Sequence, residues 1–443
     1  MEVNAIAPGR ILVLNFWTSS CINCVQTFSV LARIADAFER EPLAIVSVHC
    51  PKFPNERDPA QLRQAIARYD IRHAVISDPT GELWRRYGIE MVPTIAVVSP
   101  TGELVGSGSG EPDFGLLHEI LVDVLAEQRR SGNLPATEHV APAARPTAPA
   151  RSGQYRFPGK LLATGDRLFV ADTGHHEVVE LERASQHDWR EVRRFSGFHY
   201  PNGLALDPAS GRLFVADTGT HTVRVIRLAD GHVLAIAGTG ELGLGEPDGA
   251  APAMTTGLRS PWDLAWDARR RTLYVAMAGI HQIWAFDDET GTIRVLAGDG
   301  RERRADGTAV EASFGQPSGL ALVGDRLYVA DAQNSCVREL ALDTRMVRTV
   351  CGGALFTFGD TDAEGDAVRL QHPMGIAAID DRHLLLVDSY NHKVKRIDVQ
   401  TGGCETLWGD RRFDNPEGIS ISGRVFIADT GNHRIVEIDA TTA

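Results

Sequence analysis

The feature that most constrains the fold is a pattern that the second half of the chain repeats six times. The copies begin 41 to 60 residues apart and read LFVADTGHHEV from Leu168, LFVADTGTHTV from Leu213, LYVAMAGIHQI from Leu273, LYVADAQNSCV from Leu327, LLLVDSYNHKV from Leu384 and VFIADTGNHRI from Val425. A proline-containing turn and a short apolar strand precede each copy, and most copies are followed by another strand. Four short strands per repeat predict an all-β propeller with six blades.

Two positions of the repeat have a structural explanation. In five copies the second strand ends on an aspartate, whose carboxylate can accept backbone N–H groups and fix the turn. These residues are Asp172, Asp217, Asp331, Asp388 and Asp429. In four copies a glycine follows two residues later, and we expect it to supply a permissive backbone conformation. We interpret these aspartates and the histidines that follow them mainly as architectural.

The first 130 residues follow a different pattern, in which strand-like and helix-like segments alternate. Strands are predicted at 11–17, 43–49, 74–77, 95–98 and 104–107, the last two as a hairpin that turns at SPTGE. Helices are predicted at 24–40, 59–69 and 114–130. Strands alternating with helices of this length predict an α/β domain whose sheet is covered by helices on both faces.

A change in composition separates the two halves. Residues 141–150 read APAARPTAPA and offer too little apolar surface to fold, so we place a Pro/Ala-rich linker at 131–152. The prediction is a multidomain chain, with an α/β domain at 1–130 and a six-bladed β-propeller at 153–443. The last repeat ends after its third strand, RIVEIDA, and we expect residues 140–157 to supply the outer strand that closes the ring.

Charge and hydropathy limit the partners and the compartment. The formal net charge of −13 argues against nucleic acid and anionic membranes as partners. The apolar run 11–17 is too short for a signal peptide, and no stretch approaches the length of a membrane span. Six cysteines in 443 residues do not make a disulfide framework. We therefore expect a cytoplasmic protein.

The segment FWTSSCINCVQTF places Cys21 and Cys24 between a buried strand and a helix. They could be a redox pair, half of a zinc site, a structural disulfide or two unreactive thiols. The N-terminus of a helix favours an anion, which lowers a thiol pKa, and Cys24 lies one turn later, where it can resolve a mixed disulfide. A permanent disulfide is not expected in a reducing cytoplasm. A zinc site would need His49 and Cys50, because this half has no second Cys-x-x-Cys. We favour the redox pair.

The segments NFWTSSCINCVQTF, VHCPKFPNE and LWRRYGIEMVPT, followed by six NHL-type repeats, resemble the NHL-repeat-containing protein 2 family over nearly the whole chain. That family joins a thioredoxin-like domain to a six-bladed NHL propeller, and the first half is also similar to bacterial thioredoxin-like reductases. The resemblance implies that Cys21 is the attacking thiol and Cys24 the resolving thiol. It implies that Trp17 flanks the site, that Pro93 is a cis-proline facing the disulfide, and that Val92 presents backbone groups to a bound peptide.

The sequence departs from thioredoxin within this site. Ile22 and Asn23 stand between the cysteines where thioredoxin has Gly-Pro, so its redox potential does not transfer. Asn15 stands where thioredoxin has a buried aspartate that relays protons, and asparagine cannot titrate. Glu56 and Glu111 are the candidates to replace it. Larger members of the family carry a further C-terminal β region, and we expect this chain to act without it.

The predicted function is a thiol–disulfide oxidoreductase that acts on protein thiols or disulfides, with a propeller that recruits a protein partner or substrate. No cofactor and no metal are expected. One alternative is a propeller scaffold with a vestigial thioredoxin-like domain, whose binding face would be built by the loops 238–257, 298–315 and 352–369. Another is a thiol peroxidase, because Thr18-x-x-Cys21 matches part of a peroxiredoxin pattern, although Leu14 stands at its proline position.

A propeller-borne metallohydrolase is the last alternative. Five loop aspartates offer hard oxygen ligands that suit calcium, although Asp-Gly stretches are more often plain turns. They are Asp248, Asp306, Asp360, Asp362 and Asp366. The remaining cysteines lack Cys-x-x-Cys spacing and are interpreted as ordinary blade residues; they are Cys336, Cys351 and Cys404.

Overall fold

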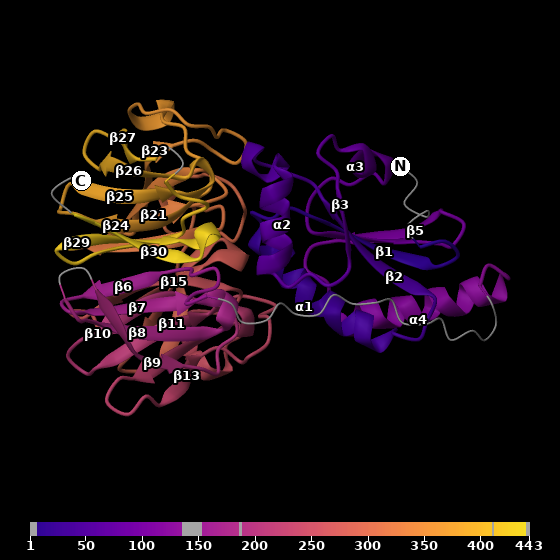
Figure 1. Cartoon of the computed structure of the whole chain (residues 1–443), viewed down its shortest axis with the longest axis horizontal. Coiled ribbons are helices and arrows are strands. Elements are labelled where there is room, and N and C mark those ends of the chain that lie inside the picture. The colour runs from indigo at the N-terminus through magenta and orange to yellow at the C-terminus, as the bar shows by residue number, and fades with distance from the viewer. Residues whose placement is uncertain (1–6, 135–152, 186–187, 410–411, 440–443) are drawn as a thin grey trace. The chain divides into compact units, whose positions relative to one another are not determined.

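The computed structural model describes residues 7–134, 153–185, 188–409 and 412–439 (Figure 1). They divide into two compact units, one within residues 1–150 and one within 151–443. Within the described part of the chain, no helix combines the length and the apolar character needed to cross a membrane.

The first unit contains a five-stranded sheet with the order β3-β2-β1-β4-β5. Its strands are β1 (Ile11–Trp17), β2 (Leu43–His49), β3 (Ala74–Ser77), β4 (Thr94–Val98) and β5 (Leu104–Ser109). β1 and β3 run parallel to β2, whereas β4 is antiparallel to both β1 and β5. The helical elements are α1 (Ile22–Ala37), η2 (Pro54–Arg57), α2 (Pro59–Arg68), α3 (Glu82–Arg86) and α4 (Phe114–Arg130). The predicted α/β class is confirmed, and η2 and α3 were not predicted.

The side chains of β1 point alternately into two cores, one on each face of the sheet. Ile11, Val13 and Trp17 pack on the face covered by α1, α2 and α4, and we call this the α1 core. The even-numbered apolar residues of β1 pack on the opposite face with Leu83 of α3. Leu134, which follows α4, is also buried in the α1 core. The expected covering of both sheet faces by helices is confirmed.

The second unit is the predicted six-bladed propeller. Blade 1 contains β6 (Leu161–Thr164), β7 (Arg167–Asp172), β8 (Glu177–Arg183) and β9 (Trp189–Phe195). Blade 2 contains β10 (Pro201–Asp207), β11 (Arg212–Asp217), β12 (Thr222–Arg227) and β13 (Val233–Ala237). Blade 3 contains β15 (Pro261–Asp267), β16 (Thr272–Met277), β17 (Gln282–Asp287) and β18 (Thr292–Ala297), with β14 (Ala251–Pro252) added at its outer edge.

The remaining blades repeat this order. Blade 4 contains β20 (Pro317–Val323), β21 (Arg326–Asp331), β22 (Cys336–Ala341) and β23 (Met346–Gly352), with β19 (Gly307–Thr308) at its outer edge. Blade 5 contains β24 (Pro373–Ala378), β25 (His383–Asp388), β26 (Lys393–Asp398) and β27 (Gly403–Trp408). Blade 6 contains β28 (Gly418–Ile421), β29 (Arg424–Asp429) and β30 (Arg434–Asp439).

Blade 6 has three strands among the described residues. Most of the segment that we expected to supply a fourth strand, residues 140–152, lies outside the described part of the chain, and residues 153–157 form no strand. Blades 6 and 1 are nevertheless joined directly, because the Thr430 hydroxyl donates to the carbonyl of Pro158 over 2.7 Å. β28 also packs against β6 where the two ends of the ring meet (Figure 1).

The repeat aspartates fix the turn that leads into their own blade, as predicted. Each Oδ1 accepts the N–H of a residue ahead of the first strand. The donors are Arg156 to Asp172, His199 to Asp217, Gln371 to Asp388 and Asp414 to Asp429 at 2.7 Å, and Gly315 to Asp331 at 2.6 Å. Blade 3 has Met277 at this position, and its sulfur lies 3.4 Å from the N–H of Arg259. The architectural interpretation of these carboxylates is confirmed.

The repeat glycines were expected to supply a permissive backbone conformation, and this explanation was wrong. These glycines are not in the left-handed region, which is occupied instead by the residue that ends each turn. Gly219 is required for space, because a Cβ there would lie 2.3 Å from Nδ1 and 2.6 Å from the carbonyl oxygen of His199. Absence of a side chain therefore lets the turn lie against the segment that enters the blade.

The left-handed residue at each turn connects neighbouring blades around the whole ring, and we call this contact the histidine latch. In five blades its Nδ1 accepts the N–H of the residue entering the next blade, at 3.0–3.3 Å. The pairs are His176 with Tyr200, His221 with Ser260, His281 with Gln316, His392 with Asn415 and His433 with Phe157. In blade 4 the hydroxyl of Ser335 accepts from His372 at 3.4 Å.

The latch predicts that acid destabilises the propeller. Nδ1 accepts a hydrogen bond only in the neutral ring, and burial, the largest cause, lowers the pKa of His221 and of His281 from 6.5 to about 4. As the pH falls from 6.5 towards 4, the unfolded chain binds these protons first, so the free energy of unfolding decreases. At about 1.4 kcal/mol per pKa unit, the loss is at most about 3.5 kcal/mol for each ring.

Urea unfolding at pH 7 and pH 4.5 measures this loss. The substitution His221→Ser copies the natural latch of Ser335 and carries no titratable ring. We expect it to reduce the difference in unfolding free energy between the two pH values, even though it lowers stability at pH 7. A variant with the same pH dependence as the wild type would contradict a titrating latch.

Candidate functional site

The two cysteines lie where β1 gives way to α1. Cys21 is the N-cap of α1 in extended conformation, and its sulfur accepts the N–H of Cys24 over 3.4 Å. The sulfur therefore occupies the position where a helix favours negative charge. Cys21 is 6% exposed, whereas Cys24 in the first turn is fully buried. The predicted placement of both residues at the start of the helix is confirmed.

Trp17 is positioned differently from the expectation of a residue that flanks bound substrate. It is fully buried, and its ring contacts Phe28 edge-on with ring centroids 5.0 Å apart. On its other side, the ring of His49 lies 4.9 Å away. Phe28 lies one turn after Cys24 on the same face of α1, so Trp17 lies beneath the first two turns of that helix. Trp17 thus supports the site from the core and has no surface for a partner in this conformation.

Val92 and Pro93 precede β4 and are joined by a cis peptide bond, as the resemblance implied. The carbonyl of Pro93 accepts the N–H of Gly110 over 2.8 Å. Pro93 is buried, and Val92 is partly buried against the core that contains both cysteines. Glu111, one of the two candidate proton carriers, is partly buried and follows Gly110 directly. The structure therefore places Glu111 next to the strand contact of Pro93.

Glu56, the other candidate, anchors the loop that precedes Cys21. Its buried carboxylate accepts hydrogen bonds from the side chains of Thr18 and Ser19 at 2.6 and 2.8 Å and from the N–H of Ser20 at 2.8 Å. It also accepts the N–H groups of residues 52 and 53 at 2.8 and 2.9 Å. Burial alone would raise the pKa of Glu56, but His49 and these donors lower it below its usual range. Glu56 is therefore ionised and positions the loop.

Asn15 belongs to a hydrogen-bonded chain that reaches away from β1. Its Nδ2 donates to the hydroxyl of Ser47 on β2 over 3.1 Å, and that hydroxyl lies 2.7 Å from Nε2 of His73. Burial lowers the pKa of His73 from 6.5 to about 4. Sequence reasoning missed Ser47 and His73, although a serine in an inward-facing position of the strand LAIVSVH was a usable signal.

The cysteine at position 50 behaves differently from the pair on α1. Its sulfur donates to the carbonyl of Val48 over 3.6 Å. Burial first, and then the carboxylates of Asp78 and Glu56, raise the pKa of the Cys50 thiol far above its ordinary value. Among the described residues, no three His, Cys, Asp or Glu side chains are arranged to hold a metal ion. The zinc alternative with His49 and Cys50 therefore has no support in the structure.

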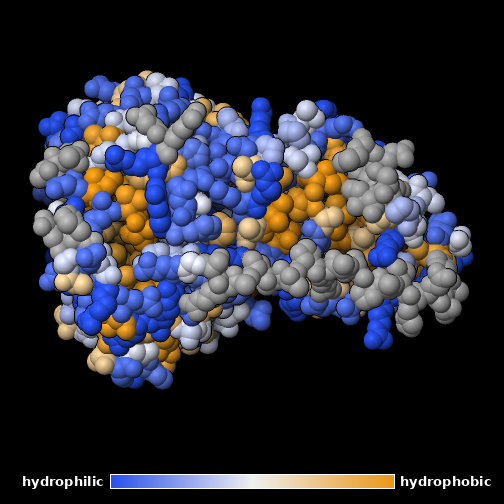
Figure 2. All heavy atoms as spheres, in the orientation of Figure 1, coloured by the Kyte–Doolittle hydropathy of each residue, from blue (hydrophilic) through white to orange (hydrophobic). Residues whose placement is uncertain are grey.

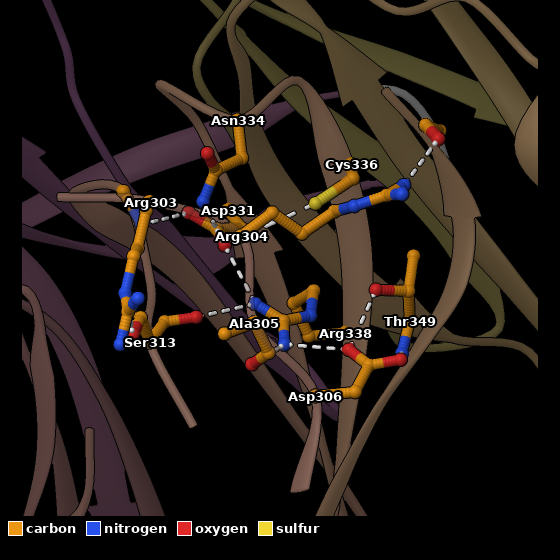
Figure 3. Close-up of polar contacts among 12 residues, drawn as sticks. Arg303, Arg304, Ala305, Asp306, Ser313, Asp331, Asn334, Cys336, Arg338 and Thr349 are labelled. Carbon is orange, nitrogen blue, oxygen red and sulfur yellow. Dashed lines mark hydrogen bonds and ion pairs between the residues drawn. The ribbon is translucent and has the colours of Figure 1, made fainter. Parts of the chain in front are cut away.

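Four of the five propeller aspartates considered for calcium bind protein groups instead. Asp306 accepts from Arg338 at 2.8 Å and from the N–H of Thr349 at 3.0 Å, and the fully buried Arg338 also pairs with Asp331 at 3.2 Å (Figure 3). The acids of the next loop pair with lysines, with Lys395 binding Asp360 at 2.9 Å and Asp362 at 2.7 Å. Asp366 pairs with Arg304 at 2.9 Å, whereas Asp248 is exposed. Asp306, Asp360 and Asp362 therefore anchor inter-blade loops to the blades, and Asp366 joins two of the loops.

The propeller cysteines are ordinary blade residues, as predicted. Cys336, Cys351 and Cys404 are buried in the blades. Burial raises the pKa of Cys336 and of Cys351 well above the ordinary range, and it raises the pKa of Cys404 to about 12. Among the cysteines that the structure describes, these three therefore have little thiolate at neutral pH.

Comparison with known proteins matches both units. A family model described as thioredoxin-like matches residues 9–104, and a model of the NHL repeat matches residues 198–226 and 413–438. Protein SUPPRESSOR OF QUENCHING 1, chloroplastic, of Arabidopsis thaliana is 34% identical over 97% of this chain and 44% of that protein. The thiol-disulfide oxidoreductase YkuV of Bacillus subtilis is 27% identical over 26% of this chain and 77% of that protein.

NHL repeat-containing protein 2 of Bos taurus is 33% identical over 98% of this chain and 67% of that protein. The chain thus spans less than half of the Arabidopsis protein and two thirds of the bovine one. Both the order of the two units and their full length are shared with the bovine protein. The chain therefore belongs to the NHL repeat-containing protein 2 family.

Proposed function

We propose that the first domain is a thiol–disulfide oxidoreductase that uses Cys21 and Cys24. The observation that carries this proposal is the position of Cys21, whose sulfur caps the N-terminus of α1 in a residue that is 6% exposed, while Cys24 is fully buried one turn later. A sulfur at a helix N-terminus is favoured as a thiolate, which is the nucleophilic form. The relation to an oxidoreductase of Bacillus subtilis over this domain supports the same chemistry.

In the proposed reaction, the Cys21 thiolate attacks one sulfur of a protein disulfide. A bond forms between Cys21 and that sulfur, the partner's disulfide breaks, and one partner thiolate leaves. The Cys24 sulfur then loses its proton and attacks Cys21, which releases the second partner thiol and leaves a Cys21–Cys24 disulfide. Two electrons pass from the dithiol to the partner. The reverse sequence oxidises a partner dithiol.

The surface beside Pro93 suits an extended protein substrate. Val92 is partly buried and its neighbour Met91 is 56% exposed, so an apolar side chain is available where the chain enters the cis bond. Backbone groups next to such a contact can bind the main chain of a peptide. We propose that this segment and Cys21 together receive a disulfide-containing segment of a partner protein in a reducing compartment such as the cytoplasm.

We further propose that the propeller recruits the partner protein through its inter-blade loops. Each of the three long loops carries a highly exposed apolar side chain, namely Leu244, Val310 and Phe356. These loops are anchored by buried polar contacts such as that of Arg338, so their exposed residues are held on ordered backbone. Elsewhere hydrophilic side chains cover much of the surface, with apolar patches between them (Figure 2). Exposed apolar residues on ordered loops favour binding to a protein.

Limited alkylation of the folded chain with iodoacetamide tests the redox assignment. We expect Cys21 to be modified before every other cysteine, because its sulfur caps a helix N-terminus and the residue keeps 6% exposure, whereas Cys24 is fully buried. Cys50 is an internal control, since it is more exposed than Cys21 but burial and nearby carboxylates raise its pKa. Mass spectrometry of digested protein gives the order of modification. Modification of Cys50 ahead of Cys21 would favour the scaffold alternative instead.

A further inference from the structure

A group of polar residues interrupts the face of the sheet that carries the α1 core. The side chains of β1 and β2 that face α1 are apolar at their first positions, as in Val13 and Ile45. Asn15, Ser47 and His49 then follow on the same face and are fully buried. Polar residues in such positions cost free energy unless they are hydrogen-bonded, so each needs a structural or chemical reason.

Asn15 and Ser47 have such a reason, but His49 does not. Asn15 and Ser47 bond to each other and onward to His73. Neither Nδ1 nor Nε2 of His49 has a hydrogen-bond partner among the described residues, although the ring is fully buried. A neutral imidazole carries one N–H and one bare nitrogen, and both require partners. The bare nitrogen of His49 is therefore available to accept a proton inside the domain.

The location of His49 connects it to the cysteines. Trp17 and His49 are paired across β1 and β2, and their rings are in contact at 4.9 Å. Trp17 lies in the α1 core with both Cys21 and Cys24, and its ring contacts Phe28, one turn after Cys24. Through its contact with Trp17, His49 therefore adjoins the core that contains both cysteines.

The charges around His49 allow it to take up a proton temporarily. The ionised carboxylate of Glu56 from η2 acts electrostatically on its ring. Burial lowers the pKa of His49, while Glu56 acts in the opposite direction. Burial thus favours the neutral ring, and an imidazolium formed during the reaction is stabilised by the nearby carboxylate. His73, the other nearby ring, already bonds to Ser47.

We propose that His49 is the proton acceptor for Cys24 during resolution of the mixed disulfide. This inference rests on the proposed oxidoreductase function. The Cys24 thiol transfers its proton to His49, its sulfur forms a bond with Cys21, and the bond between Cys21 and the partner sulfur breaks. The partner leaves as a thiolate and takes up a proton, and His49 returns to the neutral form through transfer to solvent. His49 thereby supplies the titratable group that Asn15 lacks.

The reaction with 5,5′-dithiobis(2-nitrobenzoate) separates the two steps. Attack by Cys21 releases one 2-nitro-5-thiobenzoate, and resolution by Cys24 releases a second, so stopped-flow absorbance records both phases. The experiment uses the full chain with Cys50→Ser, which removes the partly exposed third thiol of the domain. For His49→Gln we expect an unchanged first phase and a second phase about 100-fold slower at pH 7. We expect the difference to shrink towards pH 9.5, where hydroxide replaces the missing base.

The matched control is His73→Gln, which replaces a ring of the same domain and should leave the second phase within about twofold of the wild type. A normal second phase in His49→Gln at pH 7, or one slowed equally at every pH, would overturn the role of His49. If His49→Gln does not fold, the pH dependence of the second phase in the wild-type chain tests the proposal. A rate that rises in proportion to the hydroxide concentration from pH 5 to 9 would also overturn the role of His49. Loss of the first phase in the wild type would contradict the proposed function itself.

Discussion

Cys21→Ser is expected to abolish disulfide reduction by the full chain, lowering its rate about 1,000-fold or more. Serine preserves the N-cap hydrogen bond but is not a nucleophile towards disulfides at neutral pH. The effect is large because the proposed reaction has no second attacking group: Cys24 is fully buried. Reduction of insulin by the purified chain, driven by dithiothreitol and followed as turbidity, measures the rate.

Cys24→Ser should fail differently from Cys21→Ser. Cys21 still attacks, but nothing resolves the product, so a covalent complex with the substrate accumulates. We expect non-reducing electrophoresis to show this complex with Cys24→Ser and not with Cys21→Ser. The matched control is Cys50→Ser, which removes a thiol whose pKa is raised by burial and should retain the wild-type rate.

Two results would contradict the redox assignment. The first is reduction by Cys21→Ser at the wild-type rate, which would show that another thiol carries the reaction. The second is the absence of reduction by the wild-type chain together with the absence of a covalent complex in Cys24→Ser. The chain would then match the scaffold alternative, in which the propeller binds partners and the first domain does no chemistry.

Local sequence patterns were sufficient for most of the architecture. The segments Ile11–Trp17 and Leu43–His49 are continuous apolar runs bounded by polar residues, which is typical of central strands covered on both faces. The propeller followed from repetition, since each blade needs its neighbours to bury its faces. α3 was missed because ELWRR is shorter than the two turns over which helical periodicity can be recognised.

The details of the site were predictable only where they lie close together in the sequence. Cys21 at the helix N-terminus follows from the order strand, Cys-x-x-Cys, helix. The contact of Glu56 with Thr18 spans 38 residues, and that of His49 with Trp17 depends on the register of two strands. Neither contact leaves a local periodic signal. Trp17 was expected near substrate because of the resemblance, yet the structure buries it beneath α1.

The largest effect on stability is expected at the centre of the propeller, for Lys160→Met. Lys160 is buried just before β6 of blade 1; its Nζ donates to the carbonyl of Met374 in blade 5 and lies 3.5 Å from Asp263 in blade 3. Asp263 also accepts the N–H of Leu320 in blade 4 over 2.9 Å. The variant leaves this buried carboxylate without its cation, so the unfolding free energy of the propeller should fall by about 3–5 kcal/mol.

Urea unfolding followed by tryptophan fluorescence gives this difference, and Lys393→Met is the matched control. Lys393 also pairs with an aspartate, Asp360, at 2.6 Å, but its side chain is 27% exposed, and we expect a loss below about 1 kcal/mol. Because the loss at Lys160 comes from an uncompensated charge, the double variant Lys160→Met, Asp263→Asn should regain most of it. A double variant as unstable as Lys160→Met alone would show that the lysine acts by packing. A Lys160→Met variant as stable as Lys393→Met would show that water reaches Asp263.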